Sequence, residues 1–235
     1  MKRIVLAVLG LLVVGVIGLG LVYWLVLFED SPKRPVVDCE AAGTAAGTAN
    51  GSLAGVWKLK PAAASGQALL ADVAPAPWVG YRIDENLQAV HQTAVGRTSK
   101  LTGQVVVESQ AVKTATFVVD MTTVTSAKAQ RDNRMRSSGL ETDQFPTATF
   151  TLTQPVPVRE RAICQRVRAS GTLTLHGQTR PVVVPLTVSE SSGSFSVRGG
   201  LPITLSDYGI SPPSIAGFVT VEDKGTLELD LLFTR

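Results

Sequence analysis

The strongest constraint on the fold is an alternation of apolar and polar residues that begins near Leu53 and continues to the C-terminus. Successive side chains of a β-strand point to opposite faces, so this period of two is typical of antiparallel strands buried on one face. Gly, Pro, Ser and Asn separate the alternating segments, as turns require. The clearest segments are residues 101–107, 117–121, 150–152, 173–175, 182–188 and 227–233. The sequence therefore predicts an all-β domain.

Two interruptions of the alternation are informative. The apolar rhythm breaks between Leu175 and Arg180 and then resumes, which indicates a hairpin between two long strands. Residues 126–136 are instead rich in charged and helix-tolerant residues, with Ser126 at the position of an N-cap. We expect a short surface helix there that ends near Gly139.

About eight or nine strands, one helix and no alternation of strands with helices favour an antiparallel barrel. Closing the sheet on itself removes exposed strand edges, which would otherwise pair with other chains. We therefore predict a barrel of about eight strands. A sandwich of two sheets is the alternative.

A long uncharged segment, residues 4–28, lies near the N-terminus. As a helix at ~1.5 Å per residue it would exceed the ~30 Å hydrocarbon layer of a bilayer. Cleavable signal peptides have shorter apolar regions of ~7–15 residues. We therefore predict a transmembrane anchor over residues 1–28, with a processed signal as the alternative.

The residues that flank this segment predict its orientation. Lys2 and Arg3 favour a cytoplasmic N-terminus, and Tyr23 and Trp24 suit the opposite membrane interface. The remainder would then be extracytoplasmic, at the cell membrane. Residues 29–52 are too small and polar to form a core, so we expect a flexible linker there and a barrel domain over residues 53–235.

The two cysteines, Cys39 and Cys164, are far apart and belong to no motif with metal-ligand spacing, so no metal site is expected. In an oxidising compartment they could form a disulfide. They could equally remain apart, because Cys39 lies in the expected linker and the sequence does not show that the two approach each other.

Charge and composition argue against two functional classes. The net charge of +3 comes from scattered basic residues, which gives no reason to expect a nucleic-acid partner. His91 and His176 are the only histidines, and His176 falls in a predicted turn. No catalytic set or cofactor motif can be assembled, so we expect neither an enzyme nor a cofactor.

An ordered series of short motifs from Leu53 to Arg235 resembles the YceI-like family of extracytoplasmic polyisoprenoid-binding proteins. Each motif alone is weak, but their order and spacing are fairly specific. The motifs are Tyr81-Arg82-Ile83-Asp84, Val95-Gly96, Leu101-Thr102-Gly103, Val124-Thr125-Ser126, Gln130-Arg131-Asp132, residues 145–150, residues 171–180 and Asp207-Tyr208-Gly209-Ile210.

The resemblance implies a lipocalin-like barrel whose interior takes an extended isoprenoid chain, such as a polyprenyl lipid or a quinone tail. This sequence departs from the family pattern in two places. The usual His-Ser pair of the first strands is absent, and an insertion, residues 61–78, separates Trp57 from Tyr81.

The candidate cavity-lining residues are the apolar members of the alternating segments. Any β fold needs such a row for its core, and a barrel of ~8 strands is wide enough either to fill with side chains or to hold one ligand. The candidates are Phe117, Val119, Met121, Phe150, Leu152, Leu173, Leu175, Leu186 and Phe233.

Polar residues at the cavity mouth are a further expectation. Arg131 and Arg134 could meet a phosphate or quinone head group, and Tyr208 could border the cavity. A charged helix face is more often solvated, however, so a structural role is favoured for the two arginines. For Tyr208 the alternative is that it anchors a turn.

The sequence thus predicts a membrane-tethered protein that sequesters or carries an isoprenoid lipid. The alternative is a structural or protein-interaction module with a packed barrel, in which Leu69, Leu70 and Val73 of the insertion would form an exposed apolar patch. A homodimer is left open.

Overall fold

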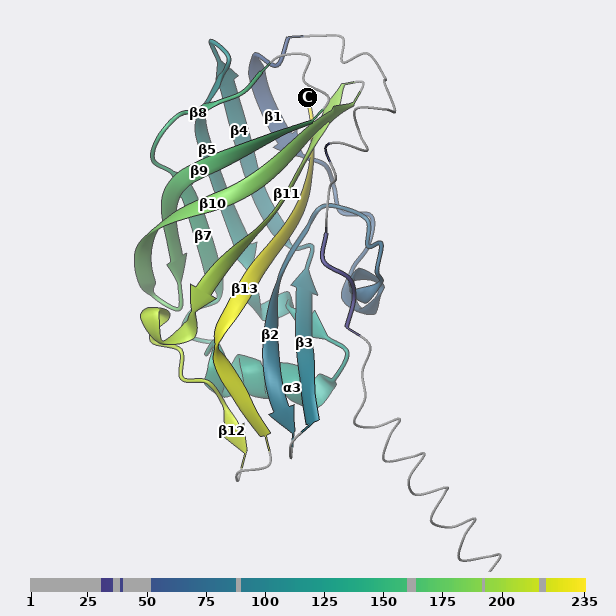
Figure 1. The fold of residues 1–235 in the computed structure, drawn as a ribbon, viewed down its shortest axis with the longest axis vertical. Coiled ribbons are helices and arrows are strands. Elements are labelled where there is room, and N and C mark those ends of the chain that lie inside the picture. The colour runs from purple at the N-terminus through teal and green to yellow at the C-terminus, as the bar shows by residue number, and fades with distance from the viewer. Residues whose placement is uncertain are drawn as a thin grey trace, which may run out of the picture. The chain divides into compact units, whose positions relative to one another are not determined.

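The computed structural model describes residues 31–35, 39, 52–87, 90–159, 164–191, 193–215 and 219–235 (Figure 1). The strands are β1 (Gly55–Leu59), β2 (Trp78–Leu87), β3 (Val90–Thr98), β4 (Leu101–Glu108), β5 (Ala111–Asp120), β6 (Thr125–Ser126), β7 (Thr147–Leu152), β8 (Val156–Pro157), β9 (Cys164–Leu175), β10 (Gln178–Ser191), β11 (Ser194–Thr204), β12 (Ser214–Ile215) and β13 (Val219–Thr234). The helical elements are η1 (Gly66–Leu70), η2 (Met121–Thr123), α3 (Ala129–Arg134), η3 (Met135–Gly139) and η4 (Leu205–Tyr208).

The sheet closes into a barrel through its first and last strands. β1 pairs with β4 on one side and with the end of β13 on the other, where Leu59 lies opposite Phe233. In the part of the chain that the structure describes, eight strands run round the barrel in the order β1-β4-β5-β7-β9-β10-β11-β13 and return to β1. This closure confirms the predicted antiparallel barrel and excludes the two-sheet sandwich.

Most of the strands outside the ring are attached through β13. This strand pairs with β2 along most of its length, with a bulge between Val221 and Gly225, before its end reaches β1. β2 then pairs with β3, and β3 with β6. Figure 1 shows β2 and β3 beside the lower part of β13, so these strands extend the wall at one end of the barrel.

The apolar face of the strands points into the barrel, where aromatic rings form the centre of the core. Phe195 stacks on Phe233 with ring centroids 4.7 Å apart, and Trp57 meets Phe195 edge-on at 4.9 Å. A second group of buried residues, around Leu175, Tyr208 and Ile210, fills the end of the barrel near η4. The alternation therefore assigned the nine candidate residues to the correct face: Leu173, Leu175 and Phe233 are buried, and the other six candidates are half-buried.

The hairpin expected around residue 177 is confirmed. β9 and β10 pair from Leu175 and Gln178 onward, and His176 and Gly177 make the two-residue turn between them. Both turn residues have positive φ angles, of 49° and 71°, as the favoured two-residue hairpin turns require. Glycine accommodates such an angle without steric cost.

The expected helix is present but begins later than predicted, and the assignment of Ser126 as its N-cap is wrong. Ser126 belongs to β6 and is completely buried, whereas Lys128 precedes the helix. Asp132 in the helix instead accepts hydrogen bonds from Ser126 N and Ser126 Oγ, at 2.8 and 2.6 Å. The helical carboxylate therefore satisfies the serine, the reverse of the expected cap.

The insertion that precedes β2 packs on the outside of β3. Leu69 of η1 is buried against Ala74 and Trp78. Arg97 of β3 stacks over the Trp78 ring at 3.9 Å and donates through Nη1 to Leu69 O and Ala71 O. The buried guanidinium therefore helps to hold the insertion to the barrel, together with hydrogen bonds from Gln67 Nε2 to Ser126 O and from Ser99 Oγ to Ala64 O.

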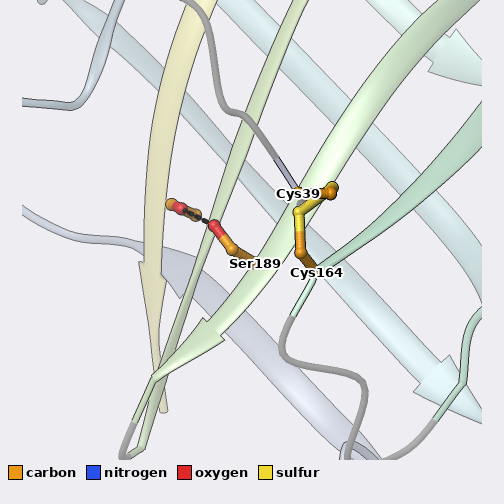
Figure 2. The surroundings of a disulfide bond; sticks show 4 residues. Cys39, Cys164 and Ser189 are labelled. Atoms are coloured by element: carbon orange, nitrogen blue, oxygen red, sulfur yellow. Dashed lines mark hydrogen bonds between the residues drawn. A yellow bond between two sulfur atoms is a disulfide. The ribbon is translucent and has the colours of Figure 1, made fainter. Parts of the chain in front are cut away.

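The residues that precede the barrel are also attached to it. Arg82 of β2 donates to Pro32 O at 2.6 Å, and Arg97 donates to Lys33 O at 3.3 Å. A disulfide joins Cys39 to Cys164, at the beginning of β9, with Cα atoms 5.3 Å apart; Figure 2 shows it beside Ser189 of β10. The pairing left open by the sequence is therefore present, and these parts of the expected linker are fixed to the barrel.

No helix in the described ranges is long and apolar enough to cross a bilayer. The segment predicted to do so, residues 4–28, lies outside the described residues, as does most of the expected linker. The anchor therefore stays a prediction.

Candidate functional site

The barrel encloses an apolar cavity of about 240 Å³. Most of its lining comes from residues of β4, β5, β7, β9, β10, β11 and β13, and nearly all of it is aliphatic or aromatic. An engineered apolar cavity of ~150 Å³ excludes water and takes up benzene, so a space of this size and character suits a hydrocarbon ligand.

Glycines opposite the aromatic rings leave the cavity open. Gly103 faces Phe117 across β4 and β5, and Gly171 lies beneath the Phe150 ring. A Cβ at either glycine would clash with the neighbouring ring, so the absence of a side chain lets each ring lie against the wall. The rings therefore lie close to the wall and contribute apolar surface to the lumen.

All nine residues predicted to line a cavity do so: Phe117, Val119, Met121, Phe150, Leu152, Leu173, Leu175, Leu186 and Phe233. Their role as ligand contacts stays a prediction.

Other lining residues were missed by the sequence reading. Phe195 and Val197 of β11 are examples, because Gly199, Gly200 and Pro202 interrupt the alternation of that strand. Ala115 and Ala169 also line the cavity. The one sequence signal for this is that each lies two residues from a larger inward-facing residue of the same strand.

Few polar side chains border the cavity, and several of them are engaged elsewhere. Glu228 pairs with Arg82 at 2.6 Å, and Gln165 exchanges hydrogen bonds with the backbone of Arg159. Burial raises the pKa of the Tyr81 hydroxyl, which keeps it protonated and neutral. The lumen can thus solvate an apolar chain but offers no converging charged groups.

The three residues proposed for the cavity mouth lie elsewhere. Arg131 donates to both carboxylate oxygens of Glu85 at 3.1 Å, and Arg134 is exposed on α3. Tyr208 is 3% exposed and packs in the group around Leu175 at the end of the barrel. None of the three lines the cavity. The placement of the two arginines agrees with the structural role that the sequence favoured.

Both ring nitrogens of His176, in the β9–β10 turn, contact neighbouring oxygen atoms. Its Nδ1 lies 3.1 Å from Tyr208 O, and its Nε2 lies 2.9 Å from Glu141 Oε2. The described residues that line the cavity include no histidine, cysteine or serine, and no described group of carboxylates, cysteines and histidines could hold a metal ion.

The fold is similar to solved structures. BcnA of Burkholderia cenocepacia is 18% identical, with a TM-score of 0.53 over 65% of this chain and 95% of BcnA. A polyisoprenoid binding domain from Saccharophagus degradans, implicated in plant cell wall breakdown, is 20% identical, with a TM-score of 0.53 over 76% of this chain and 97% of that domain. At these identities the likeness establishes the fold.

The sequence comparisons identify the family. A UPF0312 protein of Vibrio cholerae is 27% identical over 139 residues, which cover 54% of this chain and 70% of the relative. The profile of the YceI-like domain matches residues 75–233, more than half of the chain and nearly the whole barrel. The chain therefore belongs to the YceI-like family.

Proposed function

We propose that the protein holds an isoprenoid lipid, such as a polyprenyl chain or a quinone tail, inside its barrel. The observation that carries this proposal is the cavity of about 240 Å³ with its almost wholly aliphatic and aromatic lining. Exposing an apolar chain to water costs ~25 cal/mol for each Å². A lumen that encloses part of the chain removes much of that cost, and the protein can then carry or store the lipid.

The structural comparison supports this ligand class. The Saccharophagus degradans domain, which is described as polyisoprenoid binding, has the same barrel fold as this chain. Because the barrel of this chain has an open lumen at its centre, it can accept an isoprenoid ligand.

The proposal includes an extracytoplasmic location and a membrane anchor over residues 4–28. The disulfide between Cys39 and Cys164 supports the location, because such bonds persist in oxidising compartments and are rare in the cytosol. The uncharged segment preceded by Lys2 and Arg3 supports the anchor and its orientation. An anchored barrel would stay near the membrane that supplies its lipid.

The alternative of an interaction module receives less support. Leu69 of the insertion is 1% exposed and buried against the barrel, which removes it from any apolar patch. The large apolar side chains exposed among the described residues are Val56, Val73, Val118 and Val183, which lie in three different strands and one turn. Single exposed apolar side chains are ordinary on soluble surfaces.

Native mass spectrometry of the full chain, purified from its host membranes, tests the proposed function. The wild type should carry an isoprenoid adduct, and Ala169→Phe should lose it, because Ala169 lines the cavity. Val183→Phe is the matched control, because Val183 is exposed on the adjacent strand. A wild type without an isoprenoid adduct, or equal adducts in both variants, would contradict the proposal.

A further inference from the structure

The outer wall of the barrel carries a basic groove with a volume of about 740 Å³. Four arginines border it: Arg34 of the N-terminal segment, Arg166 and Arg168 of β9, and Arg198 of β11. We call this feature the outer groove. Its other residues include small or compact ones, namely Pro35, Pro185, Thr187, Gly199, Gly200 and Thr226. Short side chains between long basic ones give the wall a concave, positively charged surface.

The strand register brings three of the arginines close together. Thr187 of β10 lies opposite Arg166 on one side and opposite Arg198 on the other. Adjacent strands are ~4.8 Å apart, which places these two arginine backbones ~10 Å from each other. Arg168 lies two residues beyond Arg166 on the same face, ~7 Å away. Long side chains can span these distances and converge on one small anion.

Within the described part of the chain, only Arg198 of the four arginines is paired with a nearby carboxylate. Glu228, which borders the groove, pairs with Arg82. Asp230 pairs with Arg198 at 2.8 Å. Arg34, Arg166 and Arg168 are exposed and have no ion-pair partner among the residues that the structure describes. Like charges side by side on a sheet repel, so an anion bound between them would relieve that repulsion.

The outer groove is separate from the apolar cavity. Arg166 and Arg168 alternate along β9 with Val167 and Ala169, which line the cavity. Because alternate residues of a strand face opposite sides, the arginines lie on the outside of the same wall. A ligand of the groove is therefore not the hydrocarbon proposed for the interior.

We propose that the outer groove binds a phosphate ester. Guanidinium groups match phosphate oxygens with paired hydrogen bonds, and a phosphate offers enough oxygens for several arginines at once. The phosphate can belong to a soluble ester or to the head group of a membrane lipid. Both sources share the chemistry that the groove recognises, and they can be separated by experiment.

The test uses the full chain purified in a non-ionic detergent. Isothermal titration calorimetry with inorganic phosphate measures the soluble source, and native mass spectrometry with micelles that contain phosphatidic acid measures the lipid source. Binding in either assay should weaken in Arg166→Gln/Arg168→Gln, by about tenfold for each arginine removed. The assay that shows this loss identifies the source.

The control variant is Lys113→Gln/Arg134→Gln, which removes the same charge from exposed positions outside the groove. It should bind phosphate as the wild type does. Circular dichroism and the isoprenoid adduct check that each variant still folds and keeps its interior, so failure of the groove is distinguishable from failure of the proposed lipid function. No binding by the wild type in either assay, or an equal loss in the control, overturns the proposal.

Discussion

The ring of Phe150 lies over Gly171 on the neighbouring strand, where a Cβ would fall 2.5 Å from Phe150 Cζ. Phe150 lines the cavity and Gly171 forms part of the wall behind it. The glycine therefore determines how far the ring projects into the lumen.

Gly171→Ala should push the Phe150 ring into the lumen and narrow the cavity. Overpacking of this kind costs ~1–3 kcal/mol, so we expect the free energy of unfolding to fall by about that amount and the isoprenoid adduct to decrease. Chemical denaturation and native mass spectrometry measure the two effects. Gly139→Ala is the control, since a Cβ there would only make ordinary contact with Met135. An unchanged adduct in Gly171→Ala would show that the ring does not limit the cavity.

The disulfide should contribute substantially to stability. It joins residues 125 positions apart, and loss of a native disulfide from a small extracellular domain typically costs ~2–5 kcal/mol. The double variant Cys39→Ser/Cys164→Ser should unfold at a correspondingly lower urea concentration than the oxidised wild type. Adding a reductant should destabilise the wild type and leave the variant unchanged. A wild type insensitive to reductant would contradict this pairing.

The Asp132–Ser126 contact should hold α3 against β6. Asp132 is buried and accepts two hydrogen bonds from Ser126, so Asp132→Ala leaves buried donors without an acceptor. We expect a loss of ~1–3 kcal/mol in the free energy of unfolding. Gln130→Ala, an exposed change on the same helix, should stay within ~0.5 kcal/mol of the wild type. Equal effects from both changes would exclude a special role for Asp132.

Asp230 should make stability depend on pH in the acidic range. Burial raises the pKa of its carboxyl, although the hydrogen bond and charge of Arg198 oppose the shift. A raised folded-state pKa means that stability from this group is fully present below the unfolded pKa of ~3.9 and is lost as pH rises through the folded pKa.

The matched variant for this effect is Asp230→Asn, which cannot titrate. The free energy of unfolding of the wild type minus that of Asp230→Asn should decrease as pH rises through this window. Urea denaturation at a series of pH values measures the difference. A difference that increases with pH would mean that the ion pair with Arg198 outweighs burial.

The sequence predicted correctly the features that depend on residues close together in the chain. Strand alternation depends only on residues two apart, so it identified Phe117, Leu173 and Phe233 as one inward surface, and all of them line the cavity. The turn at His176 and Gly177 was also predicted correctly, because its positive φ angles favour particular residue types, such as glycine, at these positions.

The features that the sequence did not reveal depend on distant contacts. Nothing in the sequence near Cys39 indicates that it lies beside Cys164, because the two are 125 positions apart and are brought together by the tertiary structure. Ser126 has the sequence character of an N-cap, but pairing of β6 with β3 buries it and reverses its hydrogen bonds with Asp132. The outer groove likewise exists only after β9, β10 and β11 lie in register.

The most direct test of the lipid-binding account is a crystal structure of the full chain loaded with a polyprenyl lipid. The account predicts continuous electron density for the hydrocarbon chain inside the barrel, in contact with Phe117, Leu173 and Phe233. Density confined to the outer surface, with the lumen filled by the protein's own side chains, would contradict it.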